Sequence, residues 1–135
     1  MVQLTKDEIC AFVNRARTSR TNHALTLCQV DLSLSLKIKQ TIPLTLNDYH
    51  VVITEEYIRH VKNGHKHDVD HICRIPEIIA HFDTVSKTIE PNRRTGRTEI
   101  FVVFEKKYSD GTVKLVKLRD MRAKILSLKT LFRKE

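Results

Sequence analysis

The sequence predicts an α+β domain in which N-terminal helices pack on a four-stranded antiparallel C-terminal sheet. Three observations predict this class: helical spacing of apolar residues early in the chain, four late segments with an apolar residue at every second position, and short connections between those segments. The 135 residues fit a single domain. We expect residues 1–45 to form a helix-and-strand extension and residues 46–135 to form the core.

The first 45 residues predict one helix and one strand. The sequence TKDE at residues 5–8 has the pattern of a capping box, and apolar residues then follow at helical spacing to about residue 17. Residues 24–40 are predicted to be a strand, because Leu32, Leu34, Leu36 and Ile38 alternate with polar residues. Pro43 would end that strand.

The middle of the chain is predicted to be mainly helical. After a short apolar run at residues 51–53, Thr54 is expected to cap a helix with two glutamates in its first turn, ending near Gly64. Residues 68–80 also carry apolar residues at mixed helical spacing. Proline disfavours helical geometry at the residue before it, so Pro76 predicts two short helical pieces there.

Four strands are predicted after residue 81, at residues 82–89, 98–107, 112–118 and 124–132, because each segment alternates with a period of two. Asp110 and Gly111 lie between two of them and predict a hairpin turn. Residues 91–96 predict a longer turn that is rich in arginine. These short connections favour an antiparallel meander.

The positive charge is concentrated in the C-terminal third. The chain has a net charge of +8, and residues 91–135 contain 13 basic and 5 acidic side chains. Such a surface favours a nucleic-acid partner through attraction to phosphates, although a merely solvated basic face is the alternative. No apolar run approaches the roughly 18 residues of a membrane span, and the amphipathic N-terminus argues against a signal peptide, so a soluble protein without membrane association is expected.

The cysteines and the absence of common motifs narrow the function further. Cys10, Cys28 and Cys73 are odd in number, lack CxxC spacing and have apolar neighbours, which is typical of buried thiols in a reducing cytoplasm. The sequence has no phosphate-binding glycine loop, HExxH or EF-hand pattern. We expect no cofactor, and the chemistry must come from charged residues and histidines.

The densest group of candidate residues is YIRHVKNGHKH, residues 57–67. His60 falls in the last turn of the predicted helix, where the helix dipole and Glu56 favour a protonated imidazole that can act as an acid. His65 lies just beyond Gly64 and is a candidate partner base or phosphate contact. The alternative is that both are ordinary solvated histidines.

Metal-free RNA cleavage needs a base for the 2′-hydroxyl, an acid for the leaving 5′-oxygen, and cations or hydrogen-bond donors for the phosphorane. A histidine pair meets the first two requirements. Candidates for stabilising the phosphorane lie beside the histidines, on the first predicted strand of the sheet, or in the turn after that strand. They are Lys62, Lys66, Lys87, Thr88, Arg93, Arg94 and Arg97. The arginines are equally compatible with salt-bridged positions at the rim of the sheet.

A zinc site is an alternative use of the histidines. His67 and His71 are four residues apart on a possible helix, with Asp70 and Cys73 nearby. The neighbouring lysines and arginine oppose cation binding, and no second pair of ligands has zinc spacing. The sequence therefore predicts no metal site.

The order of motifs resembles a known group of nucleases. DYHVVIT at residues 48–54 is followed by YIRHVKNGH at residues 57–65 and by an apolar stretch with Pro76 at residues 72–79. From residue 49 onward this order resembles the phage and polymorphic-toxin nuclease domains of the barnase, EndoU, colicin and RelE-like superfamily. The resemblance implies helices against a four-stranded sheet, metal-independent endoribonuclease activity, and a histidine element that His60 and His65 match.

The same resemblance extends to the end of the chain. KTLF at residues 129–132 is similar to the superfamily's last strand, which makes Thr130 a candidate catalytic phosphate ligand and Lys129 a candidate substrate contact. The arginine cluster in the turn departs from the superfamily's pattern, so the arginine that serves as the strand cation is left open.

The sequence thus predicts a small basic endoribonuclease, phage-encoded or a delivered toxin effector, that acts on RNA such as tRNA in the cytoplasm. An acidic immunity or antitoxin protein is an expected partner. Three alternatives stay open: a nucleic-acid-binding module without catalysis, a phage or protein-interaction component that meets an acidic partner, and a metal-dependent nuclease.

Overall fold

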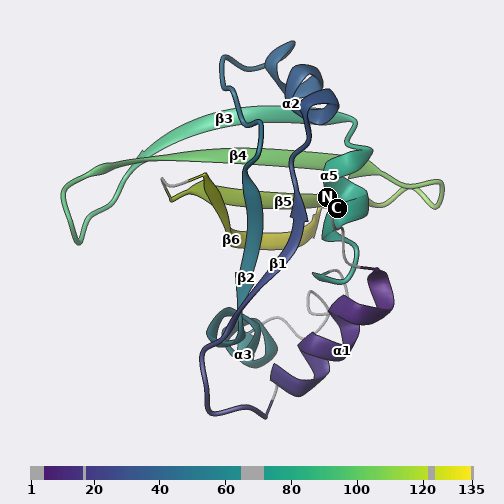
Figure 1. Ribbon diagram of the computed structural model, residues 1–135, viewed down its shortest axis with the longest axis vertical. Coiled ribbons are helices and arrows are strands. Elements are labelled where there is room, and N and C mark those ends of the chain that lie inside the picture. Colours follow the sequence, from purple (N-terminus) through teal and green to yellow (C-terminus); the bar gives the residue numbers. More distant parts are fainter. Residues whose placement is uncertain (1–4, 17, 65–71, 122–123, 135) are drawn as a thin grey trace.

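The computed structural model describes residues 5–16, 18–64, 72–121 and 124–134, with the backbone alone for residues 60–64 and 130–134. Figure 1 shows long strands crossed by two further strands, with helices at the periphery. No helix within the described ranges is long and apolar enough to cross a membrane. In chain order the elements are α1 (Lys6–Ala16), β1 (Ala24–Gln29), α2 (Leu32–Lys39), β2 (His50–Thr54), α3 (Glu55–Gly64), α5 (Ile75–Ala80), β3 (Thr84–Pro91), β4 (Thr98–Lys107), β5 (Val113–Asp120) and β6 (Ile125–Lys134).

The first helix begins as predicted. The Glu8 N–H donates to Thr5 Oγ1 at 3.2 Å, and the Thr5 N–H donates to Glu8 Oε1 at 3.1 Å, so both partners of the capping box are present. The buried side chains of α1 are Ile9, Val13 and Ala16, which share one face of the helix. The helical spacing in the sequence therefore marked the side that packs into the core.

The prediction of a strand over residues 24–40 is half wrong. The strand β1 ends at Gln29, and α2 follows, capped by Asp31, whose Oδ1 accepts the Leu34 N–H at 2.8 Å. The alternating leucines are not one buried face, because Leu32 is 60% and Leu36 is 54% exposed. The local capping interaction determined the secondary structure, and the period-two pattern was misleading.

The next helices agree with the sequence where they are described. Thr54 Oγ1 accepts the Tyr57 N–H at 3.2 Å, which confirms the predicted cap of α3. Pro76 lies in the first turn of α5, a position where proline costs no hydrogen bond. Residues 68–71, the first part of the other predicted helical region, lie outside the described residues.

The four predicted late strands are present, and each pairs antiparallel with the next. The turn between β4 and β5 contains Gly111 at φ +88°, a conformation that favours glycine. The prediction of a four-stranded sheet is wrong, because β1 and β2 extend it to six strands in the order β1-β2-β6-β5-β4-β3. Strand β2 pairs parallel with β6, so the sheet is mixed.

The hydrophobic core lies between one face of this sheet and the helices. It includes Val102, Phe104, Val116 and Leu118 from the central strands, together with Ile78 of α5, and all five side chains are fully buried. Figure 1 shows α5 lying across the strands β4 and β5, which it also contacts. The residues between these positions along each strand project from the other face.

The cysteines differ from the prediction of three buried thiols. Cys10 of α1 and Cys73 form a disulfide with 5.3 Å between their Cα atoms. Apolar neighbours are shared by buried thiols and buried disulfides, so the sequence could not distinguish them. Cys28 is a buried free thiol, as predicted, and burial raises its pKa to about 12. The cysteines therefore give no support to a reducing compartment.

Candidate functional site

The sheet face opposite the core carries a group of polar residues. In antiparallel ladders, directly opposite residues project from the same face. Thr88 pairs with Phe101, Phe101 pairs with Arg119, and Glu90 pairs with Glu99. Lys117 shares this face because it lies two residues before Arg119. We call this surface the Phe101 face; its residues are Thr88, Glu90, Glu99, Phe101, Lys117 and Arg119.

The first carboxylate of this face is held by a lysine and a threonine. Glu90 Oε2 lies 2.6 Å from Lys117 Nζ and accepts the Thr88 hydroxyl at 3.0 Å. Hydrogen bonds from Lys117 and Thr88 lower the pKa of Glu90, and the positive charge of Lys129 acts in the same direction. Glu90 is therefore ionised at neutral pH, with its charge directed toward Lys117.

The second carboxylate is held by an arginine and an asparagine. Glu99 Oε2 lies 2.8 Å from Arg119 Nε, and Glu99 Oε1 accepts the Asn92 side-chain amide at 2.8 Å. Because Glu90 and Glu99 are direct cross-strand partners, their repulsion would destabilise the sheet without these cations. Lys117 and Arg119 thus neutralise a carboxylate pair that the register of β3 and β4 creates.

An aromatic ring lies beneath the two cations. Lys117 Nζ lies 4.6 Å and Arg119 Cζ 5.7 Å from the centroid of Phe101, and both arrangements are cation–π contacts. Phe101 is only 4% exposed, although it does not belong to the main core cluster. The ring fixes both cations at the surface of the sheet. The Phe101 face therefore presents two positioned cations and two positioned carboxylates to an anionic ligand.

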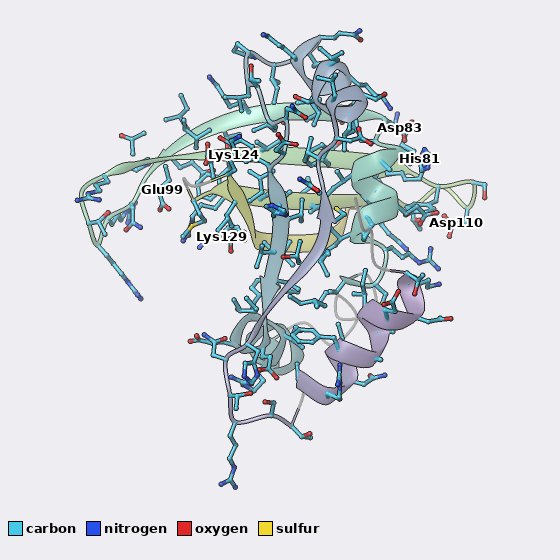
Figure 2. All side chains as sticks on the ribbon, viewed as in Figure 1. His81, Asp83, Glu99, Asp110, Lys124 and Lys129 are labelled. Carbon is cyan, nitrogen blue, oxygen red and sulfur yellow. A yellow bond between two sulfur atoms is a disulfide. The ribbon has the colours of Figure 1, made fainter. Side chains whose placement is uncertain are left out.

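Several residues predicted from the sequence lie on or near this face. Thr88 belongs to it, and Lys129 is exposed on β6 close enough to influence Glu90. Figure 2 shows Lys129 and Glu99 toward the same end of the long strands. Thr130 is the Cα partner of Lys117 on β6. Lys87 pairs with the core residue Val102 and therefore lies on the opposite face.

The predicted arginine turn between β3 and β4 is well defined. The side-chain oxygen of Asn92 accepts the backbone N–H groups of Arg94 and Thr95, and the Asn92 amide binds Glu99. The side chains of Arg93, Arg94 and Arg97 are exposed. Asn92 therefore connects the arginine turn to the Phe101 face.

The predicted histidine pair is only partly described. His60 and Lys62 belong to α3, where the description covers the backbone, and His65 and Lys66 lie outside the described residues. The helix α3 follows β2 directly, and β2 pairs with β6 beside β5. The histidine pair stays a prediction from the sequence.

The zinc alternative loses one of its ligands. The sulfur of Cys73 is bonded to Cys10 and cannot act as a thiolate ligand. His67, Asp70 and His71 lie outside the described residues. Among the residues that the structure describes, no three His, Cys, Asp or Glu side chains are grouped to hold a metal ion.

The sequence interpretation missed most of the Phe101 face. In the sequence, Glu90, Glu99, Lys117 and Arg119 are distinguished only by their places in, or directly after, predicted strands. The available signal was the spacing of two between Lys117 and Arg119, which places both cations on one face of a strand. The cross-strand partners depend on register, which that spacing does not provide.

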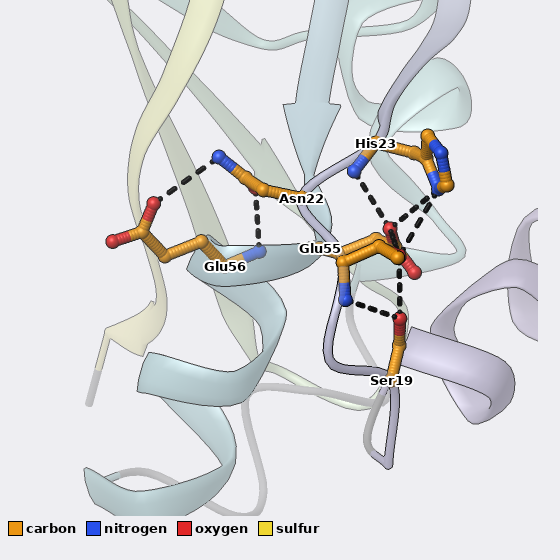
Figure 3. A network of polar contacts seen from close by, with 6 residues as sticks. Ser19, Asn22, His23, Glu55 and Glu56 are labelled. Carbon is orange, nitrogen blue, oxygen red and sulfur yellow. Dashed lines mark hydrogen bonds and ion pairs between the residues drawn. The ribbon is translucent and has the colours of Figure 1, made fainter.

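A second polar network connects the segment before β1 to the start of α3. Glu55 Oε1 accepts the His23 backbone N–H at 2.6 Å and the Thr21 hydroxyl at 2.7 Å, and it lies 3.0 Å from His23 Nδ1. Figure 3 shows this carboxylate between His23 and Ser19, with a parallel contact between Asn22 and Glu56. Because backbone groups and a helix start are its main partners, this network is structural.

The comparison with protein-family models covers most of the chain, including the Phe101 face. Residues 29–135 match the family described as phage-Barnase-EndoU-ColicinE5/D-RelE like nuclease3. The chain belongs to this family. The match contains β2 to β6, and therefore every residue of the Phe101 face of this nuclease. Comparisons with curated proteins and with solved structures gave no match.

Proposed function

We propose that this nuclease is a metal-independent endoribonuclease that binds the scissile phosphate of RNA on the Phe101 face. The observation that supports it most strongly is the pairing of two carboxylates with two cations above Phe101. Cleavage by the 2′-hydroxyl needs a base and a cation that stabilises the phosphorane. On this face a carboxylate that can act as the base lies beside such a cation.

In the proposed reaction the Glu90 carboxylate takes the proton of the ribose 2′-hydroxyl. The 2′-oxygen then forms a bond to phosphorus, and the bond from phosphorus to the 5′-oxygen breaks. An acid donates a proton to that 5′-oxygen, which leaves a 2′,3′-cyclic phosphate and a 5′-hydroxyl. Lys117 and Arg119 stabilise the extra negative charge on the phosphorane.

Substrate binding would itself activate Glu90. In the free protein, Lys117 holds Glu90 as an ionised and weak base. Because Lys117 is 23% and Glu90 is 44% exposed, a phosphate can approach both side chains. When Lys117 turns to the phosphate, Glu90 loses its strongest partner and its pKa rises toward the ordinary range, which makes it a better proton acceptor.

The sequence-based candidates complete this proposal. His60 or His65 would supply the proton to the 5′-oxygen, and Thr130 would contact the phosphate beside its strand partner Lys117. The exposed arginines at 93, 94 and 97, together with Lys62, Lys66 and Lys129, would contact flanking phosphates, whereas Lys87 lies on the opposite face of the sheet and has no part in this proposal. An acidic immunity protein would cover the same positive surface.

The partners of the two carboxylates support the proposed metal independence. A divalent cation needs carboxylate oxygens that are free of competing positive charge. Glu90 and Glu99 instead contact Lys117 and Arg119 at 2.6 and 2.8 Å. These cations would also repel a metal ion, so they favour direct stabilisation of the phosphorane.

The test is incubation of the purified protein with total tRNA in excess chelator, followed by mapping of the new RNA ends. We expect 2′,3′-cyclic phosphate ends from the wild type. Glu90→Gln should reduce the cleavage rate by about 100-fold or more, because general-base catalysis contributes that much. Lys117→Gln should reduce it similarly, and His60→Ala tests the predicted acid.

Glu105→Gln is the matched control. Glu105 accepts a hydrogen bond from the hydroxyl of Thr84 on β3, just as Glu90 accepts one from the hydroxyl of Thr88. The cleavage rate of Glu105→Gln should stay near that of the wild type. Wild-type protein that binds RNA but leaves it intact would instead support a nucleic-acid-binding module. Cleavage that disappears in chelator and returns with a divalent cation would support a metal-dependent nuclease.

A further inference from the structure

A second group of cations surrounds Tyr108, outside the Phe101 face. Lys114 Nζ lies 4.6 Å, Lys106 Nζ 5.4 Å and Arg74 Cζ 5.7 Å from the centroid of its ring. We call Arg74, Lys106, Tyr108 and Lys114 the Tyr108 cluster. Lys106 and Lys114 are direct cross-strand partners, an arrangement that is unfavourable for like charges.

Arg74 of the Tyr108 cluster lines a pocket of about 570 Å³, which is in the size range of small-ligand sites. Lys106 Nζ lies beside it, because it donates to the backbone carbonyl of the lining residue His81 at 3.3 Å. The pocket lining includes Lys6 at the start of α1, the residues Arg74 and His81 that flank α5, and Glu77 in the first turn of α5. A concave site of this size is suited to a small charged group. A broad protein interface would be flatter.

The pocket is on the opposite side of the sheet from the Phe101 face. Lys106 and Lys114 project from the same face of the sheet as the core residues of β4 and β5. Lys117 and Arg119 occupy the alternate positions and project from the other face. Figure 2 shows His81 and Asp110 at the end of the long strands opposite to Glu99 and Lys129. The two cationic sites are therefore separate.

The protein neutralises the Tyr108 cluster only in part. Glu77 Oε2 accepts the Tyr108 hydroxyl at 3.2 Å, and Asp110 accepts the hydroxyl and the N–H of Thr112 in the hairpin turn. Both carboxylates favour the charged form of Lys114. Burial and the charges of Arg74 and Lys6 nevertheless lower the pKa of Lys114, a residue that is 7% exposed. An additional anion would relieve this repulsion.

We propose that this pocket is a second phosphate-binding site, in which Lys6 and Arg74 hold a phosphate of a nucleic-acid strand or of a free nucleotide, while Lys106 and Lys114 add positive charge beside the pocket. Several cations around one concave site, including an arginine that can donate two parallel hydrogen bonds, suit a phosphate group. The proposal depends on the pocket and its charges, and it is independent of the residues proposed for cleavage.

The test is a titration with inorganic phosphate, observed through the ring resonances of Tyr108, one of only 3 tyrosines in the chain. Wild-type protein should show a saturable change at Tyr108. Arg74→Gln should weaken that binding at least fivefold, and Arg74→Lys should retain part of it. Lys117→Gln should leave it unchanged, because that variant alters only the Phe101 face.

Lys39→Gln is the matched control: it removes one positive charge from an exposed position on α2. It should bind phosphate as the wild type does. The proposal is overturned if no saturable change occurs at Tyr108, or if Lys39→Gln weakens binding as much as Arg74→Gln does. A response to polyglutamate with none to phosphate would also overturn it, since an acidic protein would then be the ligand.

Two further titrations distinguish the sources of the phosphate. A single-stranded DNA oligonucleotide, which lacks the 2′-hydroxyl, should bind more tightly than adenosine monophosphate if the site holds a strand. The reverse order indicates a free nucleotide. If phosphate binds but the wild type cleaves no RNA, the second site stands while the proposed function fails. The two conclusions can therefore be tested separately.

Discussion

At the scale of single residues, Glu55 is the carboxylate whose surroundings change its ionisation most clearly. Hydrogen bonds from Thr21 and from the His23 backbone hold the pKa of Glu55 at about 2, although its ordinary value is 4.5. Its side chain is buried and connects the segment before β1 to the first turn of α3. The folded state therefore binds the ionised form of Glu55 more strongly than the unfolded state does.

This difference predicts a specific pH dependence of stability. Because the pKa of Glu55 is lower in the folded than in the unfolded state, the interactions of its ionised carboxylate stabilise the protein fully above about pH 4.5. This contribution disappears as the pH falls toward 2. Glu55→Gln should be less stable than the wild type at pH 7, and the difference in free energy of unfolding should shrink between pH 5 and pH 2. Urea denaturation over this range measures it.

Glu56→Gln is the control for this prediction, because Glu56 is the next residue and is exposed. It should change stability less at pH 7. A difference between Glu55→Gln and the wild type that is constant from pH 7 to pH 2 would contradict the role given to the charge of Glu55.

At the scale of elements, α2 shows how a single cap can decide a secondary structure. Its alternating leucines favour a strand, yet Asp31 caps a helix in which Ile38 is fully buried and Leu36 is exposed. Asp31→Ala should lower the free energy of unfolding by about 1 kcal/mol, the usual contribution of an N-cap. Chemical denaturation at pH 7 measures this loss.

The conservative variant Asp31→Ser should retain most of the stability, because a serine hydroxyl can accept the same Leu34 N–H. An Asp31→Ala variant as stable as the wild type would show that tertiary packing alone holds α2. This outcome would remove the explanation for the failed strand prediction.

The elements with strong local signals were predictable. The capping residues Thr5 and Thr54 marked the starts of two helices, and Gly111 marked a hairpin. The parallel pairing of β2 with β6 was not predictable, because it joins strands far apart in sequence and no local residue encodes it. The carboxylate pair Glu90 and Glu99 likewise arises from register.

At the scale of the whole molecule, the disulfide connects the N-terminal helix to the segment before α5. Cys10 and Cys73 are 63 residues apart in sequence, so the bond closes a long loop and restricts the unfolded chain. Replacing both with serine should lower the free energy of unfolding by about 4 kcal/mol according to the loop-closure model. Thermal unfolding with and without dithiothreitol measures it.

The reductant provides the control for the disulfide. Dithiothreitol should lower the melting temperature of the wild type and leave that of the Cys10→Ser/Cys73→Ser variant unchanged. Equal melting temperatures of the wild type and the variant, both without reductant, would contradict a stabilising disulfide.

The central claim also belongs to this scale, because the Phe101 face is complete only when β3, β4 and β5 are assembled in register. The family match indicates a nuclease, and the arrangement of Glu90, Lys117 and Arg119 supports an attack by the ribose 2′-hydroxyl. Such a mechanism can cleave only where a 2′-hydroxyl is present.

The most direct measurement uses a DNA oligonucleotide that contains a single ribonucleotide, incubated with the protein in excess chelator. The account predicts one cut, directly after the ribonucleotide, with a 2′,3′-cyclic phosphate end, and at least 100-fold slower cleavage by Glu90→Gln. Equal cleavage of the all-DNA strand, or equal rates for the wild type and Glu90→Gln, would contradict it.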